Sequence, residues 1–208
     1  MKKLVIAGLA TLMVSPLSAM AYEAGDMIVR AGATQVMPQD NYEPYLTNAR
    51  WGLGEVKPSN DTQLGITFVY MVTNNVGVEL LAATPFEHDI KLMGGVIGET
   101  KHLPPTVSVQ YYMNNSTIVT PYVGVGLNYT FFFNEDLSTL GLNDTELQDS
   151  FGLAYQAGVD IALAGNFGLN LDVRKIDIDT EVDGTNVIDG YAVNIDPTVY
   201  SITAFYKF

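Results

Sequence analysis

The chain has no cysteine among its 208 residues. It can therefore hold neither a disulfide framework nor a lipid anchor on cysteine. Basic residues are also scarce, because 10 Lys and Arg stand against 23 Asp and Glu and give a formal net charge of −13. Binding to phosphates needs clustered Lys and Arg, so nucleic acid is not an expected partner.

The amino-terminal residues 1–21 have the pattern of a cleaved export signal. Lys2 and Lys3 precede an apolar stretch, which ends before Ala19-Met20-Ala21. A charged start, a short apolar run and an A-x-A site are typical of a signal peptide, and the run is too short to span a membrane. We therefore expect an exported mature chain, residues 22–208, that begins at Tyr22 and forms one domain.

The carboxyl-terminal residues predict a strand with one apolar face. Every second residue from Tyr200 to Phe208 is apolar or aromatic, which is the period of a β-strand. A soluble domain seldom ends on an exposed aromatic residue, because termini fray into water. A strand whose apolar face meets lipid explains this ending.

The longest uncharged stretch, residues 103–134, is not a transmembrane helix. Prolines and Asn114-Asn115 interrupt it, and its valines and aromatic residues alternate at period two, as in Val123, Val125, Leu127 and Tyr129. This pattern favours strands. In a membrane, strands must close into a barrel, because an unpaired backbone group in hydrocarbon costs several kcal/mol.

The mature chain predicts an all-β fold, an eight-stranded antiparallel up-and-down transmembrane β-barrel. The expected strands are Asp26–Thr34, Thr62–Val72, Val76–Pro85, Thr106–Met113, Ile118–Phe133, Phe151–Leu163, Phe167–Ile178 and Thr198–Phe208. Short turns alternate with long loops, which are expected at Gln35–Asp61, Phe86–Pro105, Asn134–Ser150 and Asp179–Pro197. This is the arrangement of a bacterial outer-membrane barrel with periplasmic turns, extracellular loops and both termini in the periplasm.

The register of the strands follows from their charged residues. Arg or Lys facing lipid costs about 2–4 kcal/mol at the membrane midplane, so the charged alternate positions must face the lumen. The predicted internal charge network is Arg30, Glu79, Asp160, Asp172 and Arg174. The predicted lumen-lining residues are Val69, Met71, Leu81, Tyr112, Asn128, Phe132, Asn170 and Arg174.

Several segments resemble the OmpW family of outer-membrane proteins. They are Gly77–His88, His102–Pro105, Pro121–Tyr129, Asp177–Thr180 and Asp196–Phe208, in order along nearly the whole mature chain. The resemblance implies an outer-membrane barrel of a Gram-negative bacterium, in contact with lipid and lipopolysaccharide, that passes small hydrophobic molecules. It also implies that some members serve as phage or bacteriocin receptors.

The resemblance carries three expectations about single residues. It places an apolar constriction at Leu81, and it makes the last strand, with Tyr206 and Phe208, a signal for the barrel-assembly machinery. Arg174 departs from the family pattern, since an aromatic residue stands at this position in a similar member. A purely hydrophobic lumen is therefore not expected here.

Two features leave alternatives open. Many inward positions are glycine, such as Gly124, Gly126 and Gly158; these glycines either leave a narrow void or relieve crowding in a tightly coiled barrel. The inward charges either serve transport or form a structural plug, because buried charges need partners.

Three prolines mark a candidate lateral exit. Pro85 ends one predicted strand, and Pro104 and Pro105 precede the next. Proline contributes no donor to a strand ladder, so the outer ends of these strands should pair poorly. A hydrophobic solute could leave sideways into the membrane at this point; the alternative is that proline merely terminates the strands.

The sequence gives little support for a metal site or for an enzyme. The run from Asp179 to Gly190 resembles the start of a calcium loop, but its twelfth position is glycine where calcium requires a bidentate Glu. No G-x-S-x-G elbow or H-E-x-x-H pair is present. We therefore expect no metal site, no cofactor and no enzyme activity. The leading prediction is a path for hydrophobic solutes, and the alternative is a closed structural or surface-interaction barrel.

Overall fold

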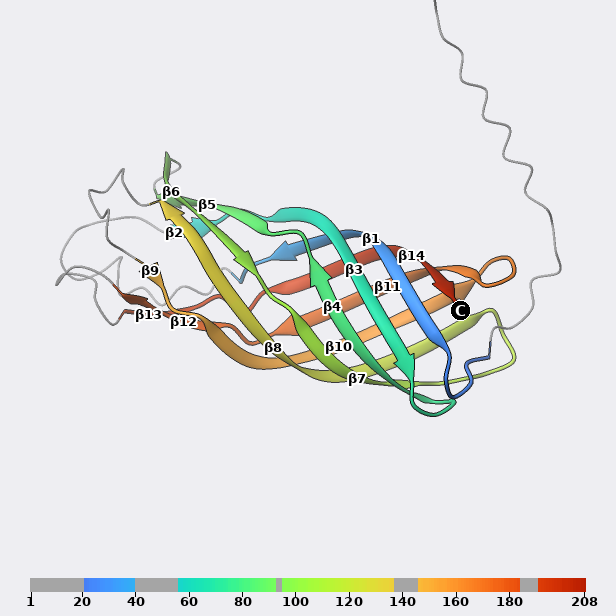
Figure 1. Cartoon of the computed structure of the whole chain (residues 1–208). Coiled ribbons are helices and arrows are strands. Elements are labelled where there is room, and N and C mark those ends of the chain that lie inside the picture. Colours follow the sequence, from blue (N-terminus) through green and yellow to red (C-terminus); the bar gives the residue numbers. More distant parts are fainter. Residues whose placement is uncertain (1–20, 40–55, 93–94, 137–145, 184–190) are drawn as a thin grey trace, which may run out of the picture.

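The computed structural model describes residues 21–39, 56–92, 95–136, 146–183 and 191–208, so residues 1–20 of the predicted signal peptide lie outside it. Within these ranges, no helix is long and apolar enough to cross a membrane. Figure 1 shows the strands, which are β1 (Met27–Met37), β2 (Val56–Pro58), β3 (Asp61–Met71), β4 (Val76–Ala83), β5 (Phe86–Leu92), β6 (Gly95–Leu103), β7 (Thr106–Tyr112), β8 (Val119–Asp136), β9 (Glu146–Leu147), β10 (Ser150–Ala162), β11 (Phe167–Ile176), β12 (Asp179–Asp183), β13 (Tyr191–Asn194) and β14 (Thr198–Lys207).

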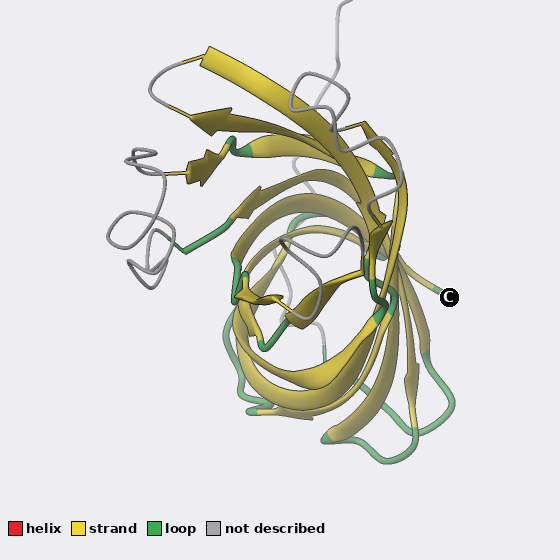
Figure 2. Ribbon diagram, turned by 90° about the vertical axis from the view of Figure 1, so that its left-hand side faces the viewer, coloured by secondary structure: helices red, strands yellow, loops and turns green. Residues whose placement is uncertain are grey.

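Eight of these strands close into an antiparallel barrel (Figure 2). They pair in the order β1, β3, β4, β7, β8, β10, β11 and β14, and β14 pairs with β1 again. The closing ladder runs from Ile28 opposite Lys207 to Met37 opposite Thr198. The predicted eight-stranded barrel is therefore confirmed, and each predicted strand begins and ends within three residues of an observed one.

The two ends of the barrel differ in their connections (Figure 1). The end that we call the turn end carries the short connections around Asn74, Asn115 and Gly165, and Phe208 lies there too. Gly165 has a φ of 58°, a left-handed conformation that glycine adopts without strain. The opposite end, the loop end, carries β2, β5, β6, β9, β12 and β13.

All four segments that we predicted as long loops contain paired strands, which corrects the prediction. In Gln35–Asp61, β2 pairs with β5, and in Asn134–Ser150, β9 pairs with β12. In the segment Phe86–Pro105, β5 pairs with β6 from Phe86 opposite His102 onward, and β6 continues along the outer part of β8. In the segment Asp179–Pro197, β12 pairs with β13. These strands were missed because they extend beyond the barrel, where no face must be apolar and the alternating pattern is absent.

The barrel strands alternate between an apolar outer face and a more polar inner face. On β7, Val107, Val109 and Tyr111 are exposed on the outside, whereas Ser108 and Gln110 are buried inside. The other barrel strands repeat the pattern, as Leu80 and Ile202 show with 50% and 63% of their surface exposed. An outer face of exposed aliphatic and aromatic residues matches contact with hydrocarbon.

The interior has apolar residues at both ends and polar residues between them. The turn-end cluster consists of Tyr22, Ile28, Val69, Met71, Tyr112, Tyr122 and Phe205. The loop-end cluster consists of Val36, Phe86, Ala154, Ile176, Ile178 and Val199. Between them lies a set that we call the polar layer, made of Arg30, Glu79, Gln110, Gln156, Asp160, Asn170, Asp172 and Arg174.

Candidate functional site in the barrel interior

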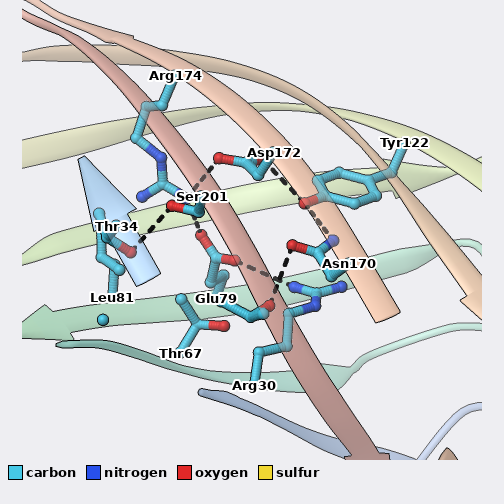
Figure 3. Close-up of a pocket in the computed structure, with 12 residues that line it drawn as sticks. Arg30, Thr34, Thr67, Glu79, Leu81, Tyr122, Asn170, Asp172, Arg174 and Ser201 are labelled. Carbon is cyan, nitrogen blue, oxygen red and sulfur yellow. Dashed lines mark hydrogen bonds and ion pairs between the residues drawn. The ribbon is translucent and has the colours of Figure 1, made fainter. Parts of the chain in front are cut away.

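Two arginines meet on one carboxylate in the middle of the barrel (Figure 3). Glu79 comes from β4, Arg30 from β1 and Arg174 from β11, and each is no more than 2% exposed. Arg30 Nη1 lies 3.2 Å from Glu79 Oε2, and Arg174 Nη2 lies 2.6 Å from Glu79 Oε1. Each oxygen of this carboxylate therefore holds a different guanidinium, and the pairing ties three strands together across the lumen.

Two further carboxylates complete the charges of the polar layer. Arg30 Nη2 lies 2.7 Å from Asp160 Oδ2, while Asn170 Nδ2 donates to Asp160 Oδ1 at 2.8 Å. Asp172 accepts a hydrogen bond of 2.8 Å from the Tyr122 hydroxyl, and its other oxygen lies 3.7 Å from Arg174 Nη2. The buried network thus holds both arginines against three carboxylates.

Glutamine side chains fill the remaining positions around Glu79. Gln110 Nε2 and Gln156 Nε2 donate to the two Glu79 oxygens at 2.8 and 3.3 Å. The Gln156 Oε1 atom accepts from Arg174 Nη2 at 2.5 Å. The Tyr112 hydroxyl donates to Gln110 and accepts from Arg30. These contacts make the polar layer a continuous hydrogen-bonded plug, in which the loss of one charged partner costs about 3–5 kcal/mol.

Three buried polar atoms of this region have no hydrogen-bond partner: Arg174 Nη1, Arg30 Nε and the Thr67 hydroxyl. All three residues line one small cavity of about 10 Å³, together with Leu81, Thr34, Ser201 and others (Figure 3). This is about the space of a single water molecule. The interior therefore contains a donor-rich hollow but no wide aqueous channel through the described residues.

An apolar compartment adjoins the polar layer on the loop side. It is the loop-end cluster, against which Ala83, Phe132 and Ile195 also pack. Aromatic stacking extends it, because the His102 ring lies 5.6 Å from Phe86 and 5.9 Å from Phe132, measured between centroids. Leu81 stands between this compartment and Glu79, two residues away on β4.

The barrel wall is interrupted beside this compartment. The ladder between β4 and β7 ends at Leu81 opposite Thr106, and pairing resumes only at Phe86 opposite His102 between β5 and β6. Between these points lie Ala82–Pro85 on one side and Leu103–Pro105 on the other, and no register pair joins them. Prolines supply three of these seven positions, which explains the missing pairing, since proline has no N–H to donate. We call this interruption the proline break.

Tyr22 closes the interior at the turn end. Its side chain is 2% exposed, its hydroxyl donates a hydrogen bond of 2.6 Å to Asp160, and its ring meets the Tyr112 ring edge-on at 4.9 Å. Lys207 Nζ lies 5.9 Å from the centre of the Tyr22 ring and forms an ion pair of 3.0 Å with Asp26. Tyr22, which precedes the first strand, therefore lies inside the lumen.

Comparison with known proteins identifies the family of this barrel. The family model described as "OmpW family" matches residues 23–208. The chain is 42% identical over 218 residues to outer membrane protein W of Escherichia coli (strain K12), with all of both chains covered. The chain belongs to the OmpW family. As an OmpW-family barrel, it is an integral protein of the Gram-negative outer membrane, and its outer face contacts the lipid of that membrane.

Two further comparisons concern the fold and a more distant relative. The crystal structure of OprG from Pseudomonas aeruginosa is similar with a TM-score of 0.76 and 38% identity, covering 90% of this chain and 98% of that one. The "dibenzothiophene metabolism operon protein PahQ" of Pseudomonas aeruginosa is 24% identical over 159 residues, 74% of each chain. The E. coli and OprG similarities extend the OmpW-family assignment over nearly the whole barrel.

The residues predicted to line the lumen of this OmpW-family barrel lie at three levels and not in one ring. Val69, Met71 and Tyr112 belong to the turn-end cluster, and Phe132 packs on the loop-end cluster. Leu81, Asn170 and Arg174 border the small cavity. Asn128 is fully buried and donates to the Thr106 hydroxyl at 3.0 Å, beside the proline break.

The five predicted charges and the terminal aromatics occupy different places. Arg30, Glu79, Asp160, Asp172 and Arg174 form one buried network. Phe208 is 63% exposed on the outside, and the Tyr206 ring packs edge-on against Phe208 and Phe167 at 4.7 Å. The terminal aromatics therefore stand on the lipid side and take no part in the interior.

The interior residues that sequence reasoning missed include Tyr22, Phe205 and most of the loop-end cluster, such as Val36 and Ile176. The inward position of Phe205 could have been predicted, because Phe205 shares the inward face of the last strand with Ser201 and Thr203. No periodic pattern covers Tyr22, which precedes β1. The glycines offered another signal: a side chain at Gly158 would collide with the Tyr122 ring, and one at Gly168 with the Phe205 ring. These two glycines make room for rings and leave no void.

Proposed function

We propose that this barrel admits small hydrophobic molecules at its loop end and releases them sideways into the outer membrane at the proline break. One observation carries the proposal: the apolar loop-end cluster lies directly beside the interruption of the wall and above a closed polar layer. A solute that enters the cluster finds apolar side chains around it and an unpaired stretch of wall next to it.

The polar layer makes a straight passage unfavourable. An apolar solute that crossed it would separate Arg30 and Arg174 from the carboxylates that hold them. Separating a buried ion pair without replacement costs about 3–5 kcal/mol, and an apolar solute offers no replacement. The Tyr22 ring stands further along the same route. The lateral route avoids both obstacles.

The name of a relative supports an apolar solute. PahQ, which is 24% identical to this chain, is named for an operon of dibenzothiophene metabolism. Dibenzothiophene is a flat aromatic molecule without charge, of the kind that a compartment of aliphatic and aromatic side chains would accept. The proposed function is passage and involves no catalytic step.

A cross-link across the proline break tests the route. The double substitution Ala82→Cys with Pro105→Cys joins the first positions beyond the Leu81–Thr106 pair, and the chain has no other cysteine. We expect the oxidised protein to lose uptake of an apolar fluorescent probe into outer-membrane vesicles, and a reductant to restore it.

The matched control lies in the intact part of the same ladder. Val78→Cys with Val109→Cys joins two directly paired outward residues of β4 and β7, so oxidation there should leave uptake unchanged. Unchanged uptake through a fully cross-linked Ala82–Pro105 pair would contradict the lateral route.

The plug also favours a second candidate function, a closed barrel that acts through its loop end. The strands β2, β5 and β6 extend the sheet beyond the barrel and offer a surface to a phage or a bacteriocin. Purified barrel in nanodiscs that neutralises such a particle, together with no measurable uptake by the wild type, would favour this function over passage.

We further propose how the protein reaches its place. Residues 1–21 would be removed on export, both termini would lie in the periplasm, and the barrel-assembly machinery would read Tyr206 and Phe208. Amino-terminal sequencing of the outer-membrane form should find Tyr22 first. Deletion of Phe208 should lower the amount of heat-modifiable barrel in the outer membrane.

A further inference from the structure

We propose that the cavity beside Arg174 binds a neutral oxygen atom, so that the barrel prefers apolar solutes carrying an alcohol or ketone group over plain hydrocarbons. This inference rests on the proposed function, because it names the class of solute that the loop-end cluster receives. It depends on a different observation, the three polar atoms without partners.

The cavity presents donors that lack acceptors. Arg174 Nη1 and Arg30 Nε carry N–H groups, Thr67 carries a hydroxyl, and none of the three atoms has a hydrogen-bond partner. Arg174 is 2% exposed and Thr67 is 8% exposed, and both line the cavity. Elsewhere in the polar layer the donors are matched to acceptors, so an acceptor is what this position lacks.

The cavity lies where the head of a solute would come to rest. Thr34, Arg174 and Ser201 line it. The next inward residues toward the loop end are Val36, Ile176 and Val199, all members of the loop-end cluster. A molecule with its apolar tail among these side chains would therefore point its head at the Arg174 guanidinium (Figure 3).

Size and charge select the kind of head. The cavity measures about 10 Å³, which is room for one oxygen atom of the size of water and not for a carboxylate or a larger anion. The surrounding network already holds three carboxylates against two arginines. A further negative charge would be repelled, whereas a neutral oxygen accepts the hydrogen bonds without adding charge.

Direct binding to the wild-type barrel in bilayer nanodiscs tests the proposal. The chain has three arginines, Arg30, Arg50 and Arg174, so selective ¹⁵N labelling of arginine gives a simple side-chain spectrum. We expect 1-octanol to shift the Arg174 signal, and n-octane and octanoate at the same concentration to leave it in place. Equal shifts from octane and octanol, or a larger shift from octanoate, would overturn the proposal.

Thr67→Val tests the hydrogen bond to the bound oxygen, because it removes one donor and keeps the shape of the side chain. Loss of one neutral hydrogen bond should weaken octanol binding about 2- to 10-fold. Thr120→Val is the matched control, since Thr120 is also buried but does not line the cavity. Identical octanol affinities for Thr67→Val and wild type would also overturn the proposal.

The two proposals fail in different ways. Uptake that the cross-link blocks, combined with no preference for octanol over octane, leaves the proposed function standing and overturns the oxygen site. If octanol shifts the Arg174 signal but the cross-link does not change uptake, the oxygen site is supported and the lateral route is overturned.

Discussion

The hydroxyl of Tyr22 donates a hydrogen bond of 2.6 Å to Asp160, 138 residues further along the chain. Asp160 also holds Arg30 at 2.7 Å, so Tyr22 is bonded directly to the polar layer. The segment before the first strand is thereby fixed inside the barrel that the last strand closes. The turn end of the lumen is filled by this ring, which packs with Tyr112 and Ile28.

Two substitutions of Tyr22 should separate the stability contributed by its hydrogen bond from the stability contributed by the packing of its ring. Tyr22→Phe removes a bond to a charged acceptor, and we expect a loss of about 1.5–3 kcal/mol in the free energy of unfolding. Tyr22→Ala also removes the ring, and it should cost about 3–5 kcal/mol. Urea unfolding in micelles measures both. Equal losses for the two variants would mean that the Tyr22 ring adds no packing energy at the turn end.

The barrel itself could be predicted from the sequence because lipid imposes a strict pattern. Hydrocarbon requires an apolar residue at every outward position, so period-two alternation marks strands such as Phe151–Leu163 and sets their register. The inward direction of Asp160 and Arg174 follows from the same constraint. No such constraint acts beyond the membrane, and β2, β5, β6, β9, β12 and β13 were therefore not predicted.

Partners inside the lumen could not be derived in the same way. The period-two alternation predicts that Glu79 faces inward, but it does not predict that Arg30 and Arg174 share the two Glu79 carboxylate oxygens. That depends on the stagger between strands and on the space left by Gly158 and its neighbours. The prolines did indicate where pairing stops, since the absence of an N–H is a property of the residue itself.

Removal of the shared carboxylate should be strongly destabilising. Glu79→Gln leaves Arg30 and Arg174 without their common partner, and we expect a loss of about 3–5 kcal/mol in the free energy of unfolding. Glu87→Gln is the control, because Glu87 forms an exposed ion pair with Lys101, and such pairs are worth about 1 kcal/mol or less. Similar losses for the two variants would show that the internal network is not the stabilising element.

Leu81 should govern entry of solute beside the polar layer. Leu81→Arg places a charge at the boundary with the apolar compartment, so uptake of the apolar probe should fall several-fold. Leu81→Met conserves volume and should cost less than about 1.5 kcal/mol of stability, with uptake preserved. Vesicle uptake normalised to folded barrel measures both variants. Uptake that is unaffected by Leu81→Arg would remove Leu81 from the route.

A methyl group at Gly158 should displace the Tyr122 ring. The added Cβ of Gly158→Ala would meet the Tyr122 ring and hydroxyl at a distance that forces a shift, and that hydroxyl donates to Asp172. Overpacking of this kind costs about 1–3 kcal/mol, and the Tyr122–Asp172 bond would be lost with it. Ala157→Val is the control, because Ala157 is exposed on the outer face and its extra methyl groups would enter lipid. Unfolding in urea should rank Gly158→Ala well below Ala157→Val in stability; the reverse order would mean that the glycine leaves usable space after all.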